Sequence, residues 1–190
     1  MLSGPKRIGI YNERDQNIEE NYMTNSSSIQ IVRADYGNLR HAAAVVSLLD
    51  AYARDVAGGG APLGDFARAN LVAALAARPK AFSVLAFDGD EAIGLINCFE
   101  GFSTFACLPL VNVHDVVVLA SHRGRRVGEQ MLALVDTIAG ERGACKLTLE
   151  VLQGNRSAIA LYERVGFTSF QLDPALGSAQ FLQKWLVPNA

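Results

Sequence analysis

Residues 116–128 have the sequence VVVLASHRGRRVG, and this stretch decides both the expected fold and the expected site. Its apolar start predicts a strand in the centre of a sheet, and its end predicts the first turn of a helix. The first turn of a helix has backbone N–H groups without helical partners and carries about half a positive charge. Arg123, Arg125 and Arg126 add full charges there, and His122 is a further cationic candidate. The segment therefore predicts a local anion site that suits a pyrophosphate.

Other phosphate-binding loops do not fit this stretch. A P-loop requires Gly-Lys-Ser or Gly-Lys-Thr at the helix start, and that sequence is absent. A dinucleotide-binding loop requires GxGxxG after the first strand of a βαβ unit, whereas this loop has only Gly124 and Gly128 and lies late in the chain. Those two glycines have no Cβ, so a ligand can approach the backbone closely. The alternative to a binding site is a basic helix start exposed to solvent.

Hydrophobic periodicity predicts the elements on either side of this stretch. Alternating residues indicate strands, spacings of three and four indicate helices, and Asp88-Gly89-Asp90 indicates a hairpin turn. The three glycines at 58–60 indicate either a flexible loop or a substrate lid. Strands are predicted at residues 28–34, 81–87, 91–102, 111–119, 146–152, 167–172 and 179–187, and helices at residues 39–53, 63–77, 127–138 and 158–165. This order predicts a mixed sheet with helices on both faces.

The composition predicts a single globular domain and its surroundings. The chain has 190 residues, of which 50% are hydrophobic and 19% charged, and its net charge is −2. We expect one domain at residues 28–190 after a polar tail or arm at residues 1–27. The near-neutral charge argues against nucleic acid or an anionic membrane as a partner.

The cysteines and the apolar runs indicate a compartment. The three cysteines form no CxxC pair and no Cys/His cluster, which predicts reduced thiols and no metal site. The amino-terminal stretch lacks the apolar core of a signal peptide, and no apolar run approaches the roughly 20 residues of a membrane span. We therefore expect a soluble, cytoplasmic protein.

Two segments carry a resemblance to a known family. RGRRVG at residues 123–128, preceded by DVVV at residues 115–118, resembles the acyl-CoA-binding signature Gln/Arg-x-x-Gly-x-Gly/Ala of the GNAT superfamily of N-acetyltransferases. NRSAIALYERVGF at residues 155–167 resembles the family pattern N-x-x-A-x-x-L-Y-x-x-x-G-F. The resemblance covers residues 28–187. It implies an α/β (α+β) fold, with a mixed, mostly antiparallel sheet of six or seven strands whose central parallel strands splay apart.

The resemblance also implies acetyl-CoA as the co-substrate. Pantetheine would lie between the splayed strands and pair with the backbone of Val116 and Val118. The family usually has glycine where this chain has Arg126, and we expect Arg126 to be already helical, with its side chain pointing outward. The expected cofactor-binding residues are Val116, Val117, Val118, Arg123, Gly124, Arg125, Arg126, Val127, Gly128, Glu129, Asn155, Ser157 and Tyr162.

Tyr162 is the expected acid in the transfer step. In the family, a tyrosine at the matching position lies near the thioester sulfur, and a phenol, with a reference pKa of about 10, is protonated at neutral pH. The alternative is that Tyr162 only packs in the core, because it lies on the apolar face of its helix. Asn155 is expected to cap that helix.

The base is less well defined. An amine must lose a proton before it attacks, and Glu100, His114, Asp115 and Glu150 all fall on strands that should line the cleft. His114 and Asp115 are expected on opposite faces unless a bulge intervenes. We expect Glu100 or His114 to act as the base.

The sequence thus predicts an acyltransferase that moves acetyl from acetyl-CoA to a primary amine by direct transfer in a ternary complex. Several acids around the cleft favour a small, cationic metabolite as acceptor. One alternative is a non-catalytic acyl-CoA sensor that regulates a protein partner, and another is a protein or peptide N-terminal acetyltransferase. A homodimer is an open alternative to a monomer, since the last strands of relatives often build dimers.

Overall fold

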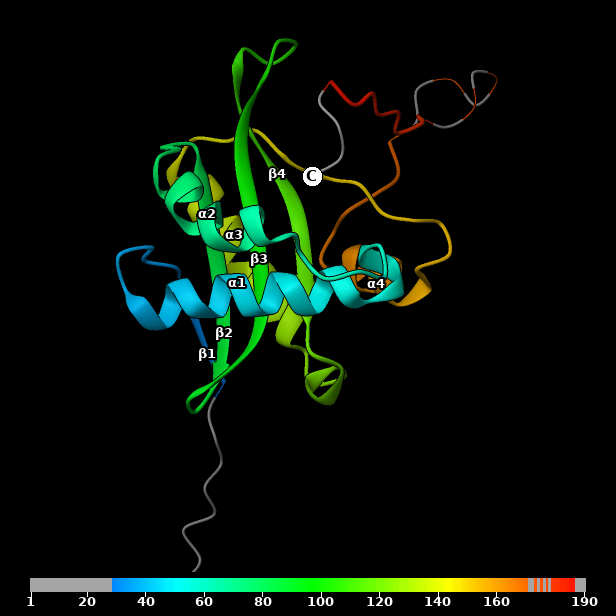
Figure 1. The fold of residues 1–190 in the computed structure, drawn as a ribbon. Coiled ribbons are helices and arrows are strands. Elements are labelled where there is room, and N and C mark those ends of the chain that lie inside the picture. The colour runs from blue at the N-terminus through cyan, green and yellow to red at the C-terminus, as the bar shows by residue number, and fades with distance from the viewer. Residues whose placement is uncertain (1–28, 171–172, 174, 176, 178, 187–190) are drawn as a thin grey trace, which may run out of the picture.

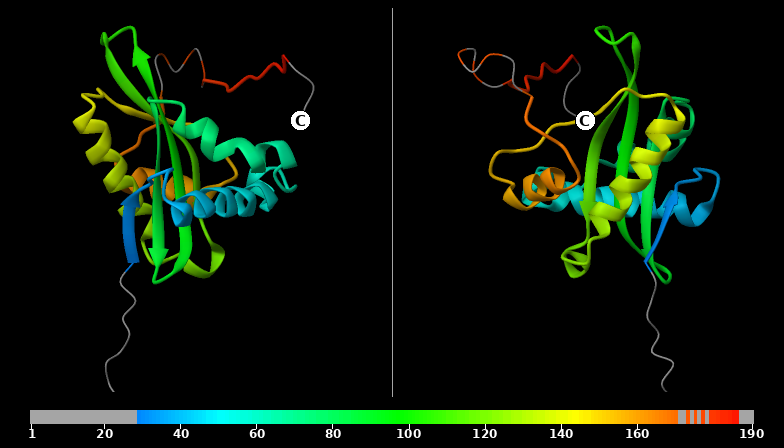
Figure 2. Two further views of the ribbon diagram at one scale, coloured as in Figure 1. Left: turned by 60° about the vertical axis from the view of Figure 1, so that its left-hand side comes forward. Right: turned by 180° about the vertical axis from the view of Figure 1, so that it is seen from behind.

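The structure is a computed structural model that describes residues 29–170, 173, 175, 177 and 179–186 of the chain. A twisted sheet forms its centre, with helices α1 and α2 on one face and α3 on the other (Figures 1 and 2). The elements in chain order are β1 (Ile29–Arg33), α1 (Leu39–Arg54), the short 3₁₀ turn η1 (Val56–Gly58), α2 (Asp65–Ala76), β2 (Ala81–Asp88), β3 (Glu91–Ser103), β4 (Leu108–Val118), the 3₁₀ turn η2 (Ala120–His122), α3 (Val127–Glu141), β5 (Leu147–Leu149) and α4 (Arg156–Arg164).

Local sequence explains where several of these elements begin and turn. Asn38 caps α1, because its side chain accepts hydrogen bonds from the N–H groups of Arg40 and His41 at 2.9 and 3.2 Å. The hairpin between β2 and β3 turns at Gly89, whose φ of 59° suits a residue without Cβ. Helices α1 and α2, the hairpin and the strand–loop–helix stretch around residues 116–128 therefore lie where the sequence predicted them.

The described sheet has five strands in the order β1-β2-β3-β4-β5. All neighbouring pairs are antiparallel except β4 and β5, which are parallel. One apolar layer joins the sheet to α3 and α4, with Met131 and Val135 fully buried, and the second joins the sheet to α1 and α2, with Val45 and Leu48 at its centre. The predicted mixed sheet with helices on both faces is confirmed.

β4 and β5 separate soon after they meet. Their pairing is confined to residues 111–113 of β4 and 147–149 of β5, whereas β4 continues to Val118. The register between β3 and β4 also shifts, because Asn97 pairs with Asp115 and Cys98 with Val113. His114 is therefore the extra residue of a β-bulge, which increases the local twist. The splayed parallel strands that the family resemblance implied are thus present.

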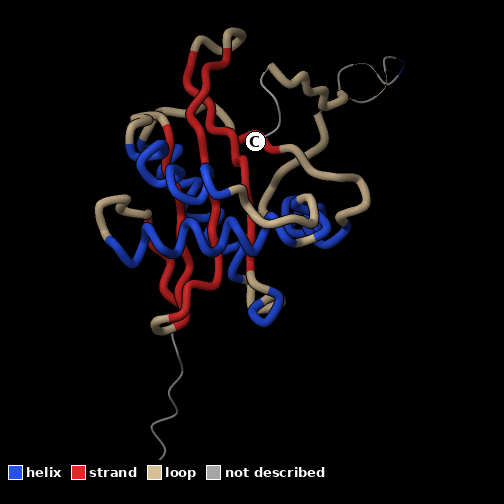
Figure 3. The backbone as a smooth tube through the Cα atoms, viewed as in Figure 1, coloured by secondary structure: helices blue, strands red, loops and turns tan. Residues whose placement is uncertain are grey.

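The carboxyl-terminal segment differs from its prediction. Strands were expected at residues 167–172 and 179–187, but residues 167–170 and 179–186 form none, and the segment is drawn as loop in Figure 3. Phe181, Leu182 and Trp185 are 74%, 83% and 63% exposed, so they do not pack on the sheet. β5, the strand beside which they would pair, has only three residues and offers few ladder hydrogen bonds.

Other predictions fall outside the described part of the chain. The tail or arm at residues 1–27 is not described, nor are residues 171, 172 and 187 of the expected last strands. Among the helices that are described, none combines the length and apolar character that crossing a membrane requires.

Candidate functional site

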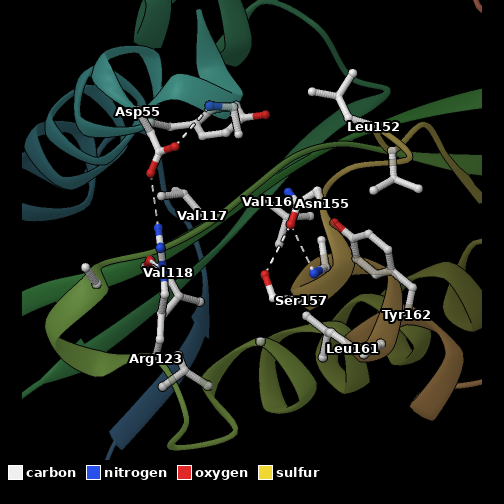
Figure 4. Close-up of a pocket in the computed structure, with 18 of the residues that line it drawn as sticks. Asp55, Val116, Val117, Val118, Arg123, Leu152, Asn155, Ser157, Leu161 and Tyr162 are labelled. Carbon is white, nitrogen blue, oxygen red and sulfur yellow. Dashed lines mark hydrogen bonds and ion pairs between the residues drawn. The ribbon is translucent and has the colours of Figure 1, made fainter. Parts of the chain in front are cut away.

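A cavity of about 1060 Å³ lies where β4 and β5 separate. Its lining comes from the end of α1 with η1, the carboxyl half of β4, the loop that enters α3, residues 150–155, and α4. Figure 4 shows Asp55, Arg123 and Tyr162 on different walls of it. The fold therefore brings the two segments that resemble the family signatures to one cavity.

The carboxyl half of β4 offers backbone groups to this cavity. Val116, Val117 and Val118 line it, and the edge beyond residue 113 has no strand partner on the β5 side within the described chain. The Val118 carbonyl instead accepts a hydrogen bond of 3.0 Å from Arg123 Nε. Because buried backbone groups need partners, this edge suits a ligand that can pair with it as a strand does.

The loop into α3 combines two left-handed residues with an uncapped helix. Gly124 has a φ of 80°, and Arg126, the residue before the helix, has φ 59° and ψ 23°. No side chain caps the first turn of α3, so its N–H groups are available to an anion. The expectation that Arg126 would already be helical is wrong, because the chain must reverse its twist there to enter α3. A position that requires positive φ is one that glycine occupies most easily.

We expect Arg126→Gly to stabilise the protein by about 1 kcal/mol. A non-glycine residue in the left-handed region costs about 1–2 kcal/mol, and glycine removes that cost at the expense of some chain entropy. The measurement is urea unfolding, with Arg126→Ala as the matched control that removes the side chain but keeps the strain. If Arg126→Ala is more stable than Arg126→Gly, Arg126 is not left-handed in solution.

Only some of the basic side chains face the cavity. Arg123 and Arg126 line it together with His122, whereas Arg125 donates to Asp88 Oδ2 at 2.7 Å and does not line it. His122 Nε2 lies 3.5 Å from the same carboxylate oxygen. Asp88, at the end of β2, therefore holds the loop before α3 against the β2–β3 hairpin. Arg125 contributes to this attachment rather than to the cavity. Each of the other residues expected to bind the cofactor lines the cavity.

Tyr162 lies deep in the cavity wall, at 9% exposure, with its ring edge-on to Phe167 at 5.8 Å. Burial, with a smaller contribution from neighbouring Tyr52, raises the pKa of Tyr162 to about 12. The phenol is therefore protonated at neutral pH. Its helix begins as predicted, because the Asn155 side chain accepts hydrogen bonds from Ala158 N–H at 3.2 Å and from Ser157 Oγ at 3.1 Å.

The start of α3 is held against α4. A Cβ added to Gly128 would lie 2.8 Å from Leu161 Cδ2, so the absence of a side chain allows this close approach. Arg164 Nε also donates to Glu129 Oε1 at 3.0 Å. These contacts place the uncapped start of α3 beside the helix that carries Tyr162.

Of the candidate bases, His114 and Glu150 line the cavity and Glu100 does not. Glu100 accepts a hydrogen bond from Arg142 at 3.1 Å and lies 3.4 Å from Lys80 Nζ, so it is held in ion pairs elsewhere on β3. His114 is exposed and packs edge-on to Phe99 at 5.3 Å. Of the two expected bases, the structure therefore places only His114 at the cavity.

The sequence did not single out two residues of the cavity, Tyr52 and Asp55, at the end of α1. Asp55 Oδ1 accepts the Ala57 N–H at 3.0 Å, and Asp55 Oδ2 lies 3.3 Å from Arg123. The only local signal was the run of glycines at 58–60, which indicated a loop or a lid. Among the described residues, no group of three or more His, Cys, Asp or Glu side chains could hold a metal ion.

Comparisons with known proteins test the family resemblance. A model of the acetyltransferase (GNAT) family matches residues 48–167. The chain is 35% identical over 97 residues to streptothricin acetyltransferase of Streptomyces lavendulae, a match that covers 51% of this chain and 49% of that protein. It is 30% identical over 84 residues to the uncharacterized N-acetyltransferase YhfO of Bacillus subtilis (strain 168), covering 44% of this chain and 56% of that protein. The chain thus spans about half the length, or less, of the curated relatives it matches.

Solved structures share the fold at low sequence identity. The aminoglycoside acetyltransferase meta-AAC0020 from an uncultured soil metagenomic sample gives a TM-score of 0.67 at 13% identity, over 83% of this chain and 96% of that one. The integron cassette protein HFX_CASS3 from the mobile metagenome of Cole Harbour Salt Marsh gives 0.67 at 23% identity, over 84% and 92%. Since the family model matches more than half of the 190 residues, between positions 48 and 167, this chain belongs to the acetyltransferase (GNAT) family.

Proposed function

We propose that this protein is an acetyl-CoA-dependent N-acetyltransferase that acetylates a primary amine of a small, cationic molecule. The observation that carries the proposal is the cavity between β4 and β5, which joins the uncapped start of α3 to Tyr162. An uncapped helix start, an unpaired strand edge and a hydrogen-bond donor follow one another along this cavity. That order matches the pyrophosphate, the pantetheine and the thioester of acetyl-CoA.

The residues present fit such a ligand. Arg123 and Arg126 supply positive charge at the start of α3, where Gly124 lets the backbone come close. The pantetheine amides would pair with β4 at Val116 and Val118, in the manner of an added strand. Ligand cavities commonly have volumes of about 300–1,000 Å³, so a cavity of about 1060 Å³ has room for the cofactor and part of an acceptor.

Direct transfer needs few groups from the protein. The amine loses a proton and attacks the thioester carbonyl carbon, so a C–N bond forms and the C–S bond breaks. His114 lines the cavity and is our candidate to accept the amine proton. Tyr162 donates a hydrogen bond to the departing sulfur, whose negative charge it stabilises. Coenzyme A leaves as the thiol once a proton has returned to the sulfur.

The acceptor is proposed from the charges of the cavity. Asp55 and Glu150 line it, and carboxylates favour a cationic amine over an anionic one. The relative named streptothricin acetyltransferase favours a small-molecule acceptor over a protein amino terminus. A non-catalytic acyl-CoA sensor remains the competing function, because it would need the same cofactor cavity.

The test is calorimetric titration with acetyl-CoA, followed by an amine panel in which released thiol is measured. We expect saturable binding, and thiol release that is faster with cationic than with anionic amines of similar size. Absence of acetyl-CoA binding would overturn the proposal. Tight binding without turnover of any amine or peptide amino terminus would instead establish a sensor.

A further inference from the structure

An ion pair joins two walls of the cavity. Arg123, in the loop before α3, lies 3.3 Å from Asp55 Oδ2, although the two residues are 68 positions apart in the sequence. The same guanidinium group donates through Nε to the Val118 carbonyl at 3.0 Å. Figure 4 shows the Arg123 side chain reaching from the α3 side of the cavity toward Asp55.

Both contacts of Arg123 occupy groups that acetyl-CoA would use. The Val118 carbonyl belongs to the β4 edge that would pair with pantetheine, and the guanidinium group is a phosphate partner at the start of α3. The pair with Asp55 is partly open to water, since the side chains are 60% and 41% exposed. Exposed ion pairs contribute little to stability, whereas arginine binds phosphate oxygens strongly in a bidentate geometry. A pyrophosphate can therefore take Arg123 from Asp55.

Asp55 would remain oriented after this exchange. Its Oδ1 accepts the Ala57 N–H at 3.0 Å and thereby caps η1, independently of Arg123. The oxygen that loses its partner is Oδ2, the one that now points to Arg123 across the cavity. Tyr52, one helical turn earlier, also lines the cavity, and its side chain interacts electrostatically with this carboxylate. A carboxylate next to an aromatic ring suits an alkylammonium group.

We propose that Asp55 binds the cationic group of the acceptor, and that it becomes free to do so when the pyrophosphate of acetyl-CoA takes Arg123. This inference rests on the proposed acetyltransferase function and names a residue that selects the acceptor. It predicts that acetyl-CoA strengthens binding of a cationic amine, because the cofactor removes the competing cation from Asp55. By reciprocity, the amine strengthens cofactor binding by the same factor.

Asp55→Asn tests the exchange with little change in shape. Asparagine keeps an oxygen for the Ala57 N–H but removes the negative charge. We expect acetyl-CoA to bind about two- to fivefold more tightly, because Arg123 loses its competing partner. We expect KM for a cationic amine to rise about tenfold or more, with kcat changed less than twofold. KM should not change for a primary amine of the same size that lacks a further cationic group. Asp55→Ser is the second variant, because a serine side chain can also accept the Ala57 N–H and cap η1 while it carries no charge.

The arginine gives a matched control by a double-mutant cycle. In an Arg123→Gln background, Asp55→Asn should no longer tighten acetyl-CoA binding, but it should still raise KM for the cationic amine. If Asp55→Asn weakens or does not alter acetyl-CoA binding and leaves KM for the amine unchanged, the exchange is wrong, while turnover by the wild type still supports the proposed function. If the wild type does not bind acetyl-CoA at all, the proposed function and this inference fail together.

Discussion

Tyr162→Phe is expected to lower kcat about 100-fold or more, while KM for acetyl-CoA changes less than threefold. The substitution removes one hydroxyl and keeps the ring that packs edge-on to Phe167. Removing one hydrogen-bond donor that stabilises the charge developing in a transition state costs about 10²- to 10³-fold in kcat. Because the interaction with the sulfur strengthens only as the C–S bond breaks, its loss lowers kcat rather than cofactor affinity.

The raised pKa of Tyr162 defines what the hydroxyl does in this step. A thiol has a reference pKa of about 8.5, whereas burial raises the pKa of Tyr162 to about 12. The thiol is thus the stronger acid, and complete transfer of the tyrosine proton to the thiolate is unfavourable. Tyr162 is expected to stabilise the departing sulfur by a hydrogen bond, while the proton that completes the thiol originates from the amine.

Tyr52→Phe is the matched control for this variant. Tyr52 lines the same cavity and, like Tyr162, has a pKa raised chiefly by burial, but the proposal gives its hydroxyl no part in the departure of the sulfur. We expect its kcat to change less than threefold. Steady-state kinetics with one good amine acceptor, together with urea unfolding of each variant, separate catalysis from stability. Equal kcat for Tyr162→Phe and wild type would show that Tyr162 only packs in the core.

The features that the sequence predicted are those that depend on local patterns. The helix that begins after Asn38, the hairpin at Gly89 and the strand–loop–helix stretch at residues 116–128 all follow from periodicity and turn residues within short windows. The resemblance of residues 155–167 to a family pattern added Tyr162, which the structure places in the cavity wall. Such features need no knowledge of distant contacts.

The features that the sequence did not predict depend on distant partners. Asp55 reaches the cavity only because the end of α1 crosses the sheet beside β4, and its partner Arg123 lies 68 residues away. Glu100 was a reasonable base by strand position, but Arg142 from the end of α3 holds it elsewhere. The left-handed conformation of Arg126 was missed because the direction in which the chain enters α3 is set by packing of α3 against the sheet.

Asn97→Leu is expected to lower the free energy of unfolding by about 2–4 kcal/mol. Asn97 is 2% exposed and lies in the middle of a row of polar side chains that crosses β2, β3 and β4 under α1. It accepts from Ser83 Oγ at 2.6 Å and donates to Asp115 Oδ2 at 3.0 Å. Leucine would remove the Asn97 donor from the part-buried Asp115 carboxylate and one of the two partners of the buried Ser83 hydroxyl, and a buried polar group that loses its partner costs about 1–3 kcal/mol.

The donor and acceptor groups of these side chains fix which residue donates each hydrogen bond along the row. The Asp115 carboxylate can only accept, so Asn97 must turn its amide nitrogen toward it and its oxygen toward Ser83. Ser83 then donates to Asn97 and accepts from the Tyr36 hydroxyl at 2.8 Å. The chain of donors therefore ends on the carboxylate next to His114 in the bulge of β4. Asn97 thereby supports the position of the proposed base as well as the fold.

Urea unfolding of a combined variant distinguishes this network from simple loss of packing. Ser83→Ala, Asn97→Leu and Asp115→Val together remove the polar groups that Asn97→Leu alone would affect, and replacing both partners by apolar groups is often nearly neutral. The Tyr36 hydroxyl loses its hydrogen bond to Ser83 in this variant, but that bond is only part-buried. We expect the triple variant to be more stable than Asn97→Leu, although it carries two further substitutions. If the three single losses instead add up in the triple variant, the row is not coupled. If the row is coupled, Asn97→Leu should also lower kcat, because the bulge that positions His114 loses a hydrogen bond. The triple variant should show the same loss of kcat, because it lacks the same hydrogen bond.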